Sequence, residues 1–383
     1  MLDEAPLSSQ AKTILGANLP PRVNTEDELC LWSPSRAALE RLLYCFQKLP
    51  LVFLAEPELN FCRLQLDPTH LANLFGLLAQ HLSDRELRQI KALAIPSHGA
   101  PQPQDFARVT TLEQVIKLHN SAWLLDLLAG GSITNHFQPI VFSQDLSQIF
   151  ALESLMRGIS REGDLISPRQ VFGVAEDLDL LCQVDLVSRQ NTIAALQRWE
   201  SNGKMFINFL PTCLEDPNFC LHCTIADIDE ANIPHERIIF EITEVERVKD
   251  IQRFRRLLDL YRDIGFQIAL DDLGSGYSSL NMLHQLRPDY IKLDLELMRN
   301  VHQDPYKSLI AAKLLEVAHS LNIPTIAEGI ETPGELDWVQ AHGATYVQGY
   351  LIGKPAPMSA QFSLLAKHKL LRQQDLSPEY PLV

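Results

Sequence analysis

Residues 267–276 read Gln-Ile-Ala-Leu-Asp-Asp-Leu-Gly-Ser-Gly, a short and mostly apolar run that ends directly in two adjacent acids and a glycine-containing loop. A run of this length and composition is typical of a buried strand. Asp271 and Asp272 therefore stand at the carboxyl end of a predicted strand, where the chain turns toward its next helix. The fold depends on whether this unit recurs along the chain.

The same unit recurs across the C-terminal part of the sequence, where short apolar runs alternate with longer amphipathic patterns from about residue 135 onward. The predicted strands are 137–142, 149–152, 205–209, 238–240, 267–270, 290–293 and 325–327, with a weaker one near 345–347. About eight strands that alternate with helices predict an α/β fold, a parallel TIM-like (β/α)8 barrel.

Polar residues follow these strands at regular intervals. The positions are Glu153, Asn208, Glu241, Asp271 with Asp272, Asp294 and Glu328. From Asn208 to Glu328 the successive intervals are 23 to 34 residues, about one strand-helix unit each. A parallel barrel directs all its strand ends to one face, so these side chains are expected to share a single rim.

A rim with so many carboxylates is costly unless cations neutralise it. Carboxylate and amide oxygens favour Mg²⁺, Mn²⁺ or Ca²⁺ over zinc. The adjacent Asp271 and Asp272, together with the distant acids, suit two ions, which can activate water and stabilise a phosphoryl displacement. Lys292 shares a strand face with Asp294 and adds a cation there. One acid after a strand is usually a helix cap or a solvated loop residue, but six positions in successive units favour a shared metal site.

Bulk properties narrow the function further. The net charge of −15 disfavours a reader of nucleic acid polymers. The sequence has no run of about 18 apolar residues, so no membrane span is expected, and its acidic N-terminus lacks a secretory signal. We therefore expect a cytoplasmic protein. Seven scattered cysteines, including the pair Cys220 and Cys223, do not suggest a disulfide framework.

Composition divides the chain into four parts. They are a small α/β or mostly helical domain at 1–95, a linker and connecting helix at 96–130, the barrel at 131–371, and a tail at 372–383. The linker is predicted from the proline-rich stretch 96–104. His136 is expected to have an ordinary surface or packing role.

Ordered motifs run along about residues 130–358: Phe137-Gln-Pro-Ile140, Glu153-Ser-Leu-Met-Arg157, Asn208, Glu241-Ile-Thr-Glu244, the stretch from Asp271 to Ser279, Lys292-Leu-Asp294, Ala327-Glu-Gly-Ile-Glu-Thr332 and Gln348-Gly-Tyr350. In these motifs the barrel sequence resembles the EAL family of cyclic di-GMP phosphodiesterases. The resemblance implies hydrolysis of cyclic di-GMP to linear pGpG with Mg²⁺ or Mn²⁺.

The resemblance also implies a role for each matching residue. The matching metal ligands are Glu153, Asn208, Glu241 and Asp271, with Asp272, Asp294 and Glu328 near the second ion and its waters. Lys292 and Glu328 match residues that position or deprotonate the attacking water. Six residues match positions that bind the substrate in this family: Gln138, Leu155, Arg157, Asp272, Gln348 and Glu331. Of these, Arg157 matches the residue that holds a phosphate. Glu244 matches an acid that fixes the loop from Leu273 to Ser279.

The signature has three departures: Ser154 replaces an alanine, and Leu273 and Ser275 stand where Phe and Thr are common. Because every matching acid is present, an enzyme is favoured over a cyclic di-GMP receptor or a protein-interaction scaffold. A homodimer through the barrel is implied by the family, and residues 1–95 are expected to bind an unidentified signal or protein partner. Calcium is expected to inhibit, because its looser geometry suits catalysis less well.

Overall fold

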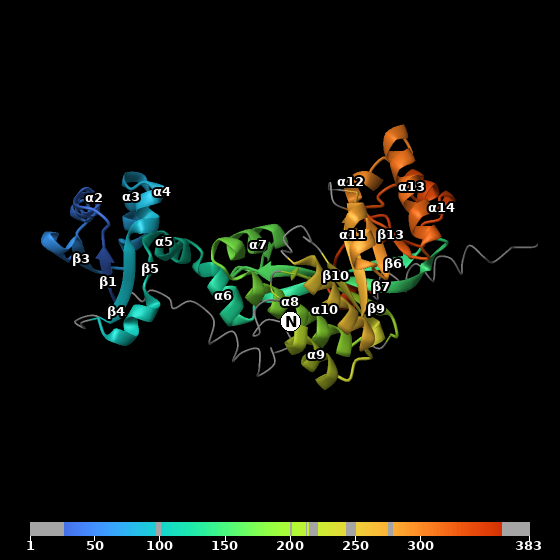
Figure 1. Cartoon of the computed structure of the whole chain (residues 1–383), viewed down its shortest axis with the longest axis horizontal. Coiled ribbons are helices and arrows are strands. Elements are labelled where there is room, and N and C mark those ends of the chain that lie inside the picture. The colour runs from blue at the N-terminus through green and yellow to red at the C-terminus, as the bar shows by residue number, and fades with distance from the viewer. Residues whose placement is uncertain are drawn as a thin grey trace, which may run out of the picture. The chain divides into compact units, whose positions relative to one another are not determined.

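The computed structural model describes residues 27–96, 101–199, 201–211, 213, 221–242, 250–274 and 279–361 (Figure 1). The described residues divide into two compact units, which are described separately: residues 27–129 with 172–180, and the barrel unit formed by residues 130–171 and 181–361. The predicted tail at 372–383 lies outside the described residues, as does the predicted barrel end at 371.

The N-terminal unit is an α/β domain. Its elements are β1 (Asp27–Trp32), α2 (Arg36–Gln47), β2 (Phe53–Glu56), η1 (Pro57–Leu59), β3 (Phe61–Gln65), α3 (Leu71–His81), α4 (Asp84–Gln89), β4 (Lys91–Pro96), η2 (Pro103–Arg108), β5 (Thr110–Thr111), α5 (Leu112–Asn120) and α6 (Ala122–Gly130). The strands form an antiparallel sheet in the order β2-β3-β1-β4-β5. The order of elements from β1 to β4 and the pairing of these strands are those of a ferredoxin-like fold.

The predicted linker at 96–130 belongs largely to this unit. Thr110 and Thr111 form β5, which pairs with β4, and α5 places Leu112, Val115 and Ile116 in the core that the sheet shares with α2 and α3. The proline-rich composition predicted a connecting segment, but the amphipathic residues after it bury an apolar face. The single connecting helix expected within 96–130 is instead two helices, α5 and α6.

The C-terminal part of the chain alternates strands and helices as predicted. Its elements are β6 (Ile133–Phe142), β7 (Asp145–Ile159), β8 (Leu165–Ile166), α7 (Pro168–Asp177), α8 (Leu181–Gln197), β9 (Lys204–Phe209), α9 (Leu221–Glu230), η4 (His235–Arg237), β10 (Ile238–Ile242), α10 (Ile251–Asp263), β11 (Gln267–Leu273), α11 (Ser279–Leu286), β12 (Tyr290–Leu293), α12 (Leu295–Met298), α13 (Pro305–Ser320), β13 (Thr325–Ala327), α14 (Pro333–Ala341) and β14 (Tyr346–Val347).

Eight of these strands close into a barrel in the order β6-β14-β13-β12-β11-β10-β9-β7, and β6 pairs with β7 to complete it. The expectation of an all-parallel barrel is wrong at one strand, because β6 runs antiparallel to both neighbours. The reason is that β6 and β7 are joined by a short turn, which permits only an antiparallel hairpin. Glu153 consequently lies inside the long strand β7 rather than just after a short one.

Two apolar layers hold the barrel. The strands and their helices share the larger core, which includes Phe240, Leu258 and Leu315. Inside the barrel, each strand contributes one residue to a smaller apolar layer: Ile140, Ala151, Phe206, Ile239, Ala269, Tyr290, Ile326 and Tyr346. Interior positions alternate with exterior ones along every strand, so this layer fixes which residues point inward.

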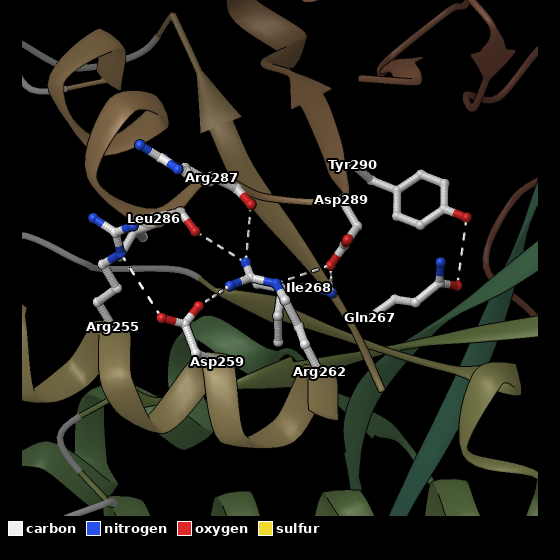
Figure 2. A network of polar contacts seen from close by, with 9 residues as sticks. All are labelled: Arg255, Asp259, Arg262, Gln267, Ile268, Leu286, Arg287, Asp289 and Tyr290. Carbon is white, nitrogen blue, oxygen red and sulfur yellow. Dashed lines mark hydrogen bonds and ion pairs between the residues drawn. The ribbon is translucent and has the colours of Figure 1, made fainter. Parts of the chain in front are cut away.

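A polar network at the amino ends of β11 and β12 joins α10 to α11 (Figure 2). Arg262 on α10 donates to the backbone oxygens of Leu286 and Arg287 at 2.9 and 3.0 Å, and its Nε lies 3.3 Å from Asp289 Oδ2. The same Asp289 oxygen accepts from the backbone N–H of Ile268 at 2.8 Å. Arg262 therefore satisfies the carbonyls at the end of one helix and fixes the starts of two strands.

Replacing Arg262 with alanine is expected to lower the free energy of unfolding by about 2 kcal/mol, because charge-assisted hydrogen bonds to partly buried groups are lost. Urea denaturation of the full chain measures this. The matched control is Arg255→Ala, since Arg255 makes an exposed ion pair with Asp259 at 3.9 Å, worth less than about 1 kcal/mol. Equal losses in the two variants would contradict the role given to Arg262.

The described residues contain one disulfide, although the scattered cysteines suggested no disulfide framework. Cys182, at the start of α8, forms a disulfide with Cys213, which follows β9, although the two are 31 residues apart in the sequence. Sequence spacing gave no sign of the pairing, because it depends on how α8 packs beside the barrel. Cys220 lies outside the described residues, as does the side chain of Cys223. In the part of the chain that the structure describes, no helix has the length and apolar character needed to span a bilayer.

Candidate metal centre

A ring of polar side chains lies one layer beyond the apolar layer inside the barrel. It is formed by the residues two positions farther along each parallel strand, where side chains again point inward. These residues are Glu153, Asn208, Glu241, Asp271, Lys292, Glu328 and Gln348, and the antiparallel β6 contributes Gln138, two positions before Ile140. Strand register supports the alignment, since Glu241 pairs with Asn208 and Glu153 pairs with Gln138. The structure thus brings the predicted residues of seven strand ends together.

Lys292 lies at the centre of this ring and is only 1% exposed. Its Nζ is 3.4 Å from a carboxylate oxygen of Glu153 and 3.4 Å from one of Asp271. It also forms ion pairs with Glu241 and Glu328. Four carboxylates therefore share a single ammonium group, and the cluster is short of positive charge.

The charge deficit appears in the pKa values. Burial raises the pKa of Glu241 well above its usual value, and the neighbouring carboxylates add to this shift while Lys292 opposes it. Burial also raises the pKa of Glu328 to about 8, even though Lys292 lies against it. Burial disfavours the charge of Lys292, but the four acids outweigh this effect and raise its pKa well above the usual value. The site therefore holds protons that a divalent cation would displace.

A bulge places two consecutive acids at the rim. The pairing of β11 with β12 shifts register between Leu270 and Leu273, and Asp272 has a φ of 54°. This left-handed conformation re-aims the side chain, as bulges near functional sites often do. Burial and the nearby Asp271 and Asp294 raise the pKa of Asp272 to about 6.

Asp294 reaches the same rim in a second role. One of its carboxylate oxygens accepts the backbone N–H groups of Glu296 and Leu297, at 2.9 and 3.3 Å, and so caps α12. One oxygen of Asp294 therefore acts as a helix cap, the role that a single acid after a strand usually has. The other oxygen takes no part in the cap.

Amide side chains orient the acids. Gln348 donates to Glu153 and to Oε1 of Gln138, the latter at 3.2 Å, and both glutamines are buried. The Nδ2 of Asn208 lies 3.5 Å from Glu153 Oε1 and 3.4 Å from the backbone oxygen of Ser154. This arrangement leaves the side-chain oxygen of Asn208 as a possible ligand.

The remaining predicted site residues lie farther from the cluster. Leu155 and Arg157 follow Glu153 on the same face of β7 and are half-buried. Glu331 lies outside the ring, with its carboxylate 4.0 Å from Arg299 and 41% exposed. Glu244 lies outside the described residues, as does most of the loop after Leu273.

Ser154, the departure beside Glu153, faces away from the ring. Its hydroxyl accepts from Asn135 Nδ2 at 2.6 Å and lies 2.7 Å from the hydroxyl of Thr192 on α8. All three side chains are buried. The substitution therefore makes a hydrogen-bonded contact between β6, β7 and α8 and does not alter the acidic cluster.

The donor set fits a hard divalent cation. Carboxylate oxygens of Glu241, Asp271 and Glu328 lie within 4.8 Å of one another. Both oxygens of Glu241 and Oδ1 of Asp271 are buried without a hydrogen-bond partner in the described part of the chain, apart from their ion pairs with Lys292. Oxygen ligands of this kind select Mg²⁺, Mn²⁺ or Ca²⁺. From the sequence we did not predict that Lys292 lies at the centre of the ring. Its position two residues beyond Tyr290, an interior residue of β12, could have indicated this.

The raised pKa values predict how metal-free stability depends on pH. Glu328 titrates near 8 in the folded protein, against an ordinary value of 4.5, so the folded state holds more protons in that range. Its contribution to stability is full below about pH 4.5 and is lost as the pH rises through 8. We expect the melting temperature in EDTA to fall between pH 5.5 and 8.5 and the fall to shrink in Glu328→Gln. A slope that is the same in both proteins would contradict this assignment.

A family model described as the EAL domain matches residues 121–355, more than half of the chain. The chain belongs to the EAL domain family. The match covers the whole carboxylate ring, from Gln138 to Gln348, so the acids described above are those of an EAL domain. The resemblance drawn from the motifs is therefore confirmed.

Named relatives agree with this assignment. The chain is 32% identical over 231 residues to the probable cyclic di-GMP phosphodiesterase PdeG of Escherichia coli, covering 59% of this chain and 45% of that protein. It is 28% identical to the cyclic di-GMP phosphodiesterase PdeR of Escherichia coli, covering 61% of this chain and 35% of that protein. The chain thus spans less than half the length of these curated relatives.

A solved structure supports the EAL fold. The structure of a standalone versatile EAL protein from Vibrio cholerae, in its c-di-GMP-bound form, is 35% identical in sequence, with a TM-score of 0.52. The alignment covers 59% of this chain and 92% of that one.

Proposed function

We propose that the EAL domain of this chain hydrolyses cyclic di-GMP to linear pGpG with Mg²⁺ or Mn²⁺. One observation carries the proposal: four carboxylates surround a single buried ammonium group, with oxygen atoms left for cations. A domain that only bound the dinucleotide would not need to bury four carboxylates that repel one another, which costs free energy. The choice of cyclic di-GMP as the substrate rests on similarity to relatives described as cyclic di-GMP phosphodiesterases.

The ligands of the first ion would be Glu153, Asn208, Glu241 and Asp271, and those of the second would include Asp272, Asp294 and Glu328. Bound ions of this type lower the pKa of water and stabilise charge on the phosphoryl oxygens. Gln348 and Asn208 hold the carboxylate of Glu153 in place.

Proton transfer is assigned to the pair of Lys292 and Glu328. Glu328 accepts a hydrogen bond from Lys292 at 2.5 Å. This pair positions the attacking water, and Glu328 takes its proton as the water oxygen bonds to phosphorus. The P–O3′ bond then breaks, the ribose oxygen takes a proton from solvent and Glu328 releases its own to solvent, which leaves pGpG. Arg157 holds a phosphate, and Gln138 and Leu155 contact the dinucleotide.

A homodimer through the barrel is proposed on a separate observation. Five apolar side chains at or next to α13 are exposed, at fractions from 40% to 80%: Tyr306, Leu309, Ile310, Val317 and Leu321. Most recur at helical spacing and form a stripe, which favours contact with a second copy. Leu309→Glu is expected to shift the chain toward monomer in sedimentation analysis.

The ferredoxin-like unit is proposed to regulate the barrel through a signal or partner that remains to be identified.

Chromatography of the products tests the proposed reaction. The full chain is incubated with cyclic di-GMP in Mg²⁺, Mn²⁺, Ca²⁺ or EDTA. We expect pGpG with the first two ions, little product with Ca²⁺, and none in EDTA. Binding without any product in Mg²⁺ or Mn²⁺ would replace the enzyme with a cyclic di-GMP receptor, and product formation stimulated by Ca²⁺ would contradict the expected inhibition.

A further inference from the structure

The segment that follows strand β9 is attached to helix α8 by the disulfide between Cys182 and Cys213. Cys182 is the second residue of α8, and Cys213 lies four residues beyond the end of β9. Their Cα atoms are 5.3 Å apart, a distance typical of bridged cysteines. Asn208, the metal ligand proposed on β9, precedes Cys213 by five residues. The disulfide therefore holds the chain directly after a proposed metal ligand.

Strand pairing supports Asn208 on one side more than on the other. Toward β10 the pairing continues to Phe209, which lies opposite Ile242. Toward β7 the register ends one residue before Asn208, where Ile207 lies opposite Ser154. On this second side, the disulfide to α8 is the attachment that follows the end of the ladder. The backbone at Asn208 therefore depends partly on that bond.

The side chain of Asn208 is held only loosely by its own contacts. Its Nδ2 lies 3.5 Å from Glu153 Oε1 and 3.4 Å from the backbone oxygen of Ser154, distances beyond those of ordinary N–H···O hydrogen bonds. The orientation of the amide must therefore come largely from the backbone of β9. A change in the segment after β9 would reach the proposed metal ligand by this route.

Helix α8, in contrast, is fixed by contacts that do not involve the disulfide. Asn135 on β6 donates to the backbone oxygen of Ser188 at 3.0 Å and to the hydroxyl of Thr192 at 2.7 Å. Arg189, which is fully buried, donates to the hydroxyl of Thr224 on α9. These contacts hold the helix against both neighbours. Opening the disulfide would therefore release the segment after β9 and leave α8 in place.

The two sulfur atoms of the disulfide differ in their access to solvent. Cys213 is fully buried, whereas Cys182 is only half-buried, so a reductant from solution reaches Cys182 first. Cys182 also lies in the first turn of the 17-residue helix α8, where backbone N–H groups stabilise a thiolate. A disulfide whose reduced form is stabilised in this way is easier to reduce.

The disulfide partners also differ from the free cysteines that the structure describes. Cys30, Cys45 and Cys62 are free and fully buried. Burial raises the pKa of Cys30 and of Cys45, and it raises the pKa of Cys62 to about 12. Their thiolate forms are therefore scarce near pH 7, and such cysteines react slowly. Among these described cysteines, redox chemistry is favoured at the Cys182–Cys213 pair.

We propose that Cys182 and Cys213 form a redox-modification site for a dithiol reductant, and that reduction weakens divalent-cation binding through Asn208. The inference rests on the proposed function, since it takes Asn208 as a metal ligand. A thiolate of the dithiol attacks Cys182 Sγ, and the S–S bond breaks with its electron pair on Cys213. The second thiolate of the dithiol then displaces Cys182 and closes the reductant's own disulfide. Two electrons and two protons pass from the dithiol to the cysteines.

The full chain is compared before and after treatment with dithiothreitol, which is then removed by desalting without oxygen. Alkylation with iodoacetamide and peptide mass analysis should label Cys182 and Cys213 only after reduction. Reduction is expected to raise the Kd for Mn²⁺ about tenfold, the lower end of the loss when support for a metal ligand is removed. Backbone hydrogen exchange over residues 205–209 should become faster in the reduced chain without metal.

Two variants control for other effects of the reductant. Cys182→Ser should bind Mn²⁺ as weakly as the reduced chain and should not respond to dithiothreitol. Cys45→Ala, which removes a free thiol of α2 in the other unit, should respond as the unaltered chain does.

The possible outcomes separate this inference from the proposed function. Alkylation of Cys182 and Cys213 before reduction, or equal Mn²⁺ affinity in the two redox states, would overturn the inference. Faster exchange after reduction with no Mn²⁺ bound in either state would overturn the proposed metal centre and the link to Asn208, and would leave the redox-modification site in place. A redox-dependent Mn²⁺ affinity with no pGpG formed in either state would overturn the proposed hydrolysis alone.

Discussion

Glu241→Gln is expected to reduce hydrolysis of cyclic di-GMP by at least about 10³-fold while making the metal-free protein more stable. Glu241 is fully buried, and its pKa is raised by burial and by the acids around it. Glutamine keeps the shape but removes the charge, so repulsion in the empty cluster falls. The same change removes a proposed metal ligand, and several kcal/mol of lost charge stabilisation correspond to a rate loss of this size.

Two measurements check this prediction together. Product formation in Mg²⁺ gives the rate, and thermal unfolding in EDTA should show a melting temperature higher by about 2–4 °C, which corresponds to roughly 1 kcal/mol. The control is Glu40→Gln on the exposed surface of α2, which should change neither quantity. A variant that keeps its rate, or one that loses both rate and metal-free stability, would contradict the role of Glu241.

Lys292→Met is expected to have the largest effect on stability. Its ammonium group is the cation shared by Glu153, Glu241, Asp271 and Glu328. Removing one partner from a buried ion cluster costs about 3–5 kcal/mol, because the remaining charges are left uncompensated. Divalent cations supply positive charge at the same place, so added Mg²⁺ should recover part of the loss.

Urea denaturation in EDTA and in Mg²⁺ measures both effects. Lys91→Met is the control, since Lys91 is exposed on β4, and it should show less than about 1 kcal/mol of change under either condition. A loss for Lys292→Met no larger than for Lys91→Met would show that Lys292 does not neutralise the acids. A loss of unfolding free energy that Mg²⁺ does not reduce would show that Lys292 and the divalent cations do not neutralise the same acids.

Much of the barrel could be predicted from sequence, because its strands are buried on both sides and read as short apolar runs. The run 325–327 coincides with β13, and 290–293 coincides with β12. The acids after these runs were assigned to one rim by topology alone. The structure adds the reason for four of them: Glu153, Glu241, Asp271 and Glu328 each lie two residues beyond a member of the interior apolar layer.

Other features depend on contacts that spacing does not encode. The antiparallel direction of β6 follows from a tight hairpin, and the bulge that aims Asp272 depends on pairing between β11 and β12. The predicted linker was wrong in part because Leu112, Val115 and Ile116 pack against a distant sheet. The Cys182–Cys213 disulfide likewise arises only when distant segments meet.

A Mn²⁺ titration followed by electron paramagnetic resonance measures whether the carboxylate ring binds divalent cations. The free-ion signal is measured for the unaltered full chain and for Glu241→Gln at the same protein concentration, at pH 7.5. We expect the unaltered chain to remove Mn²⁺ from solution with saturable stoichiometry and Glu241→Gln to bind it at least about tenfold more weakly. Equal Mn²⁺ binding by the two proteins, or none by the unaltered chain, would show that the carboxylate ring is not a cation site.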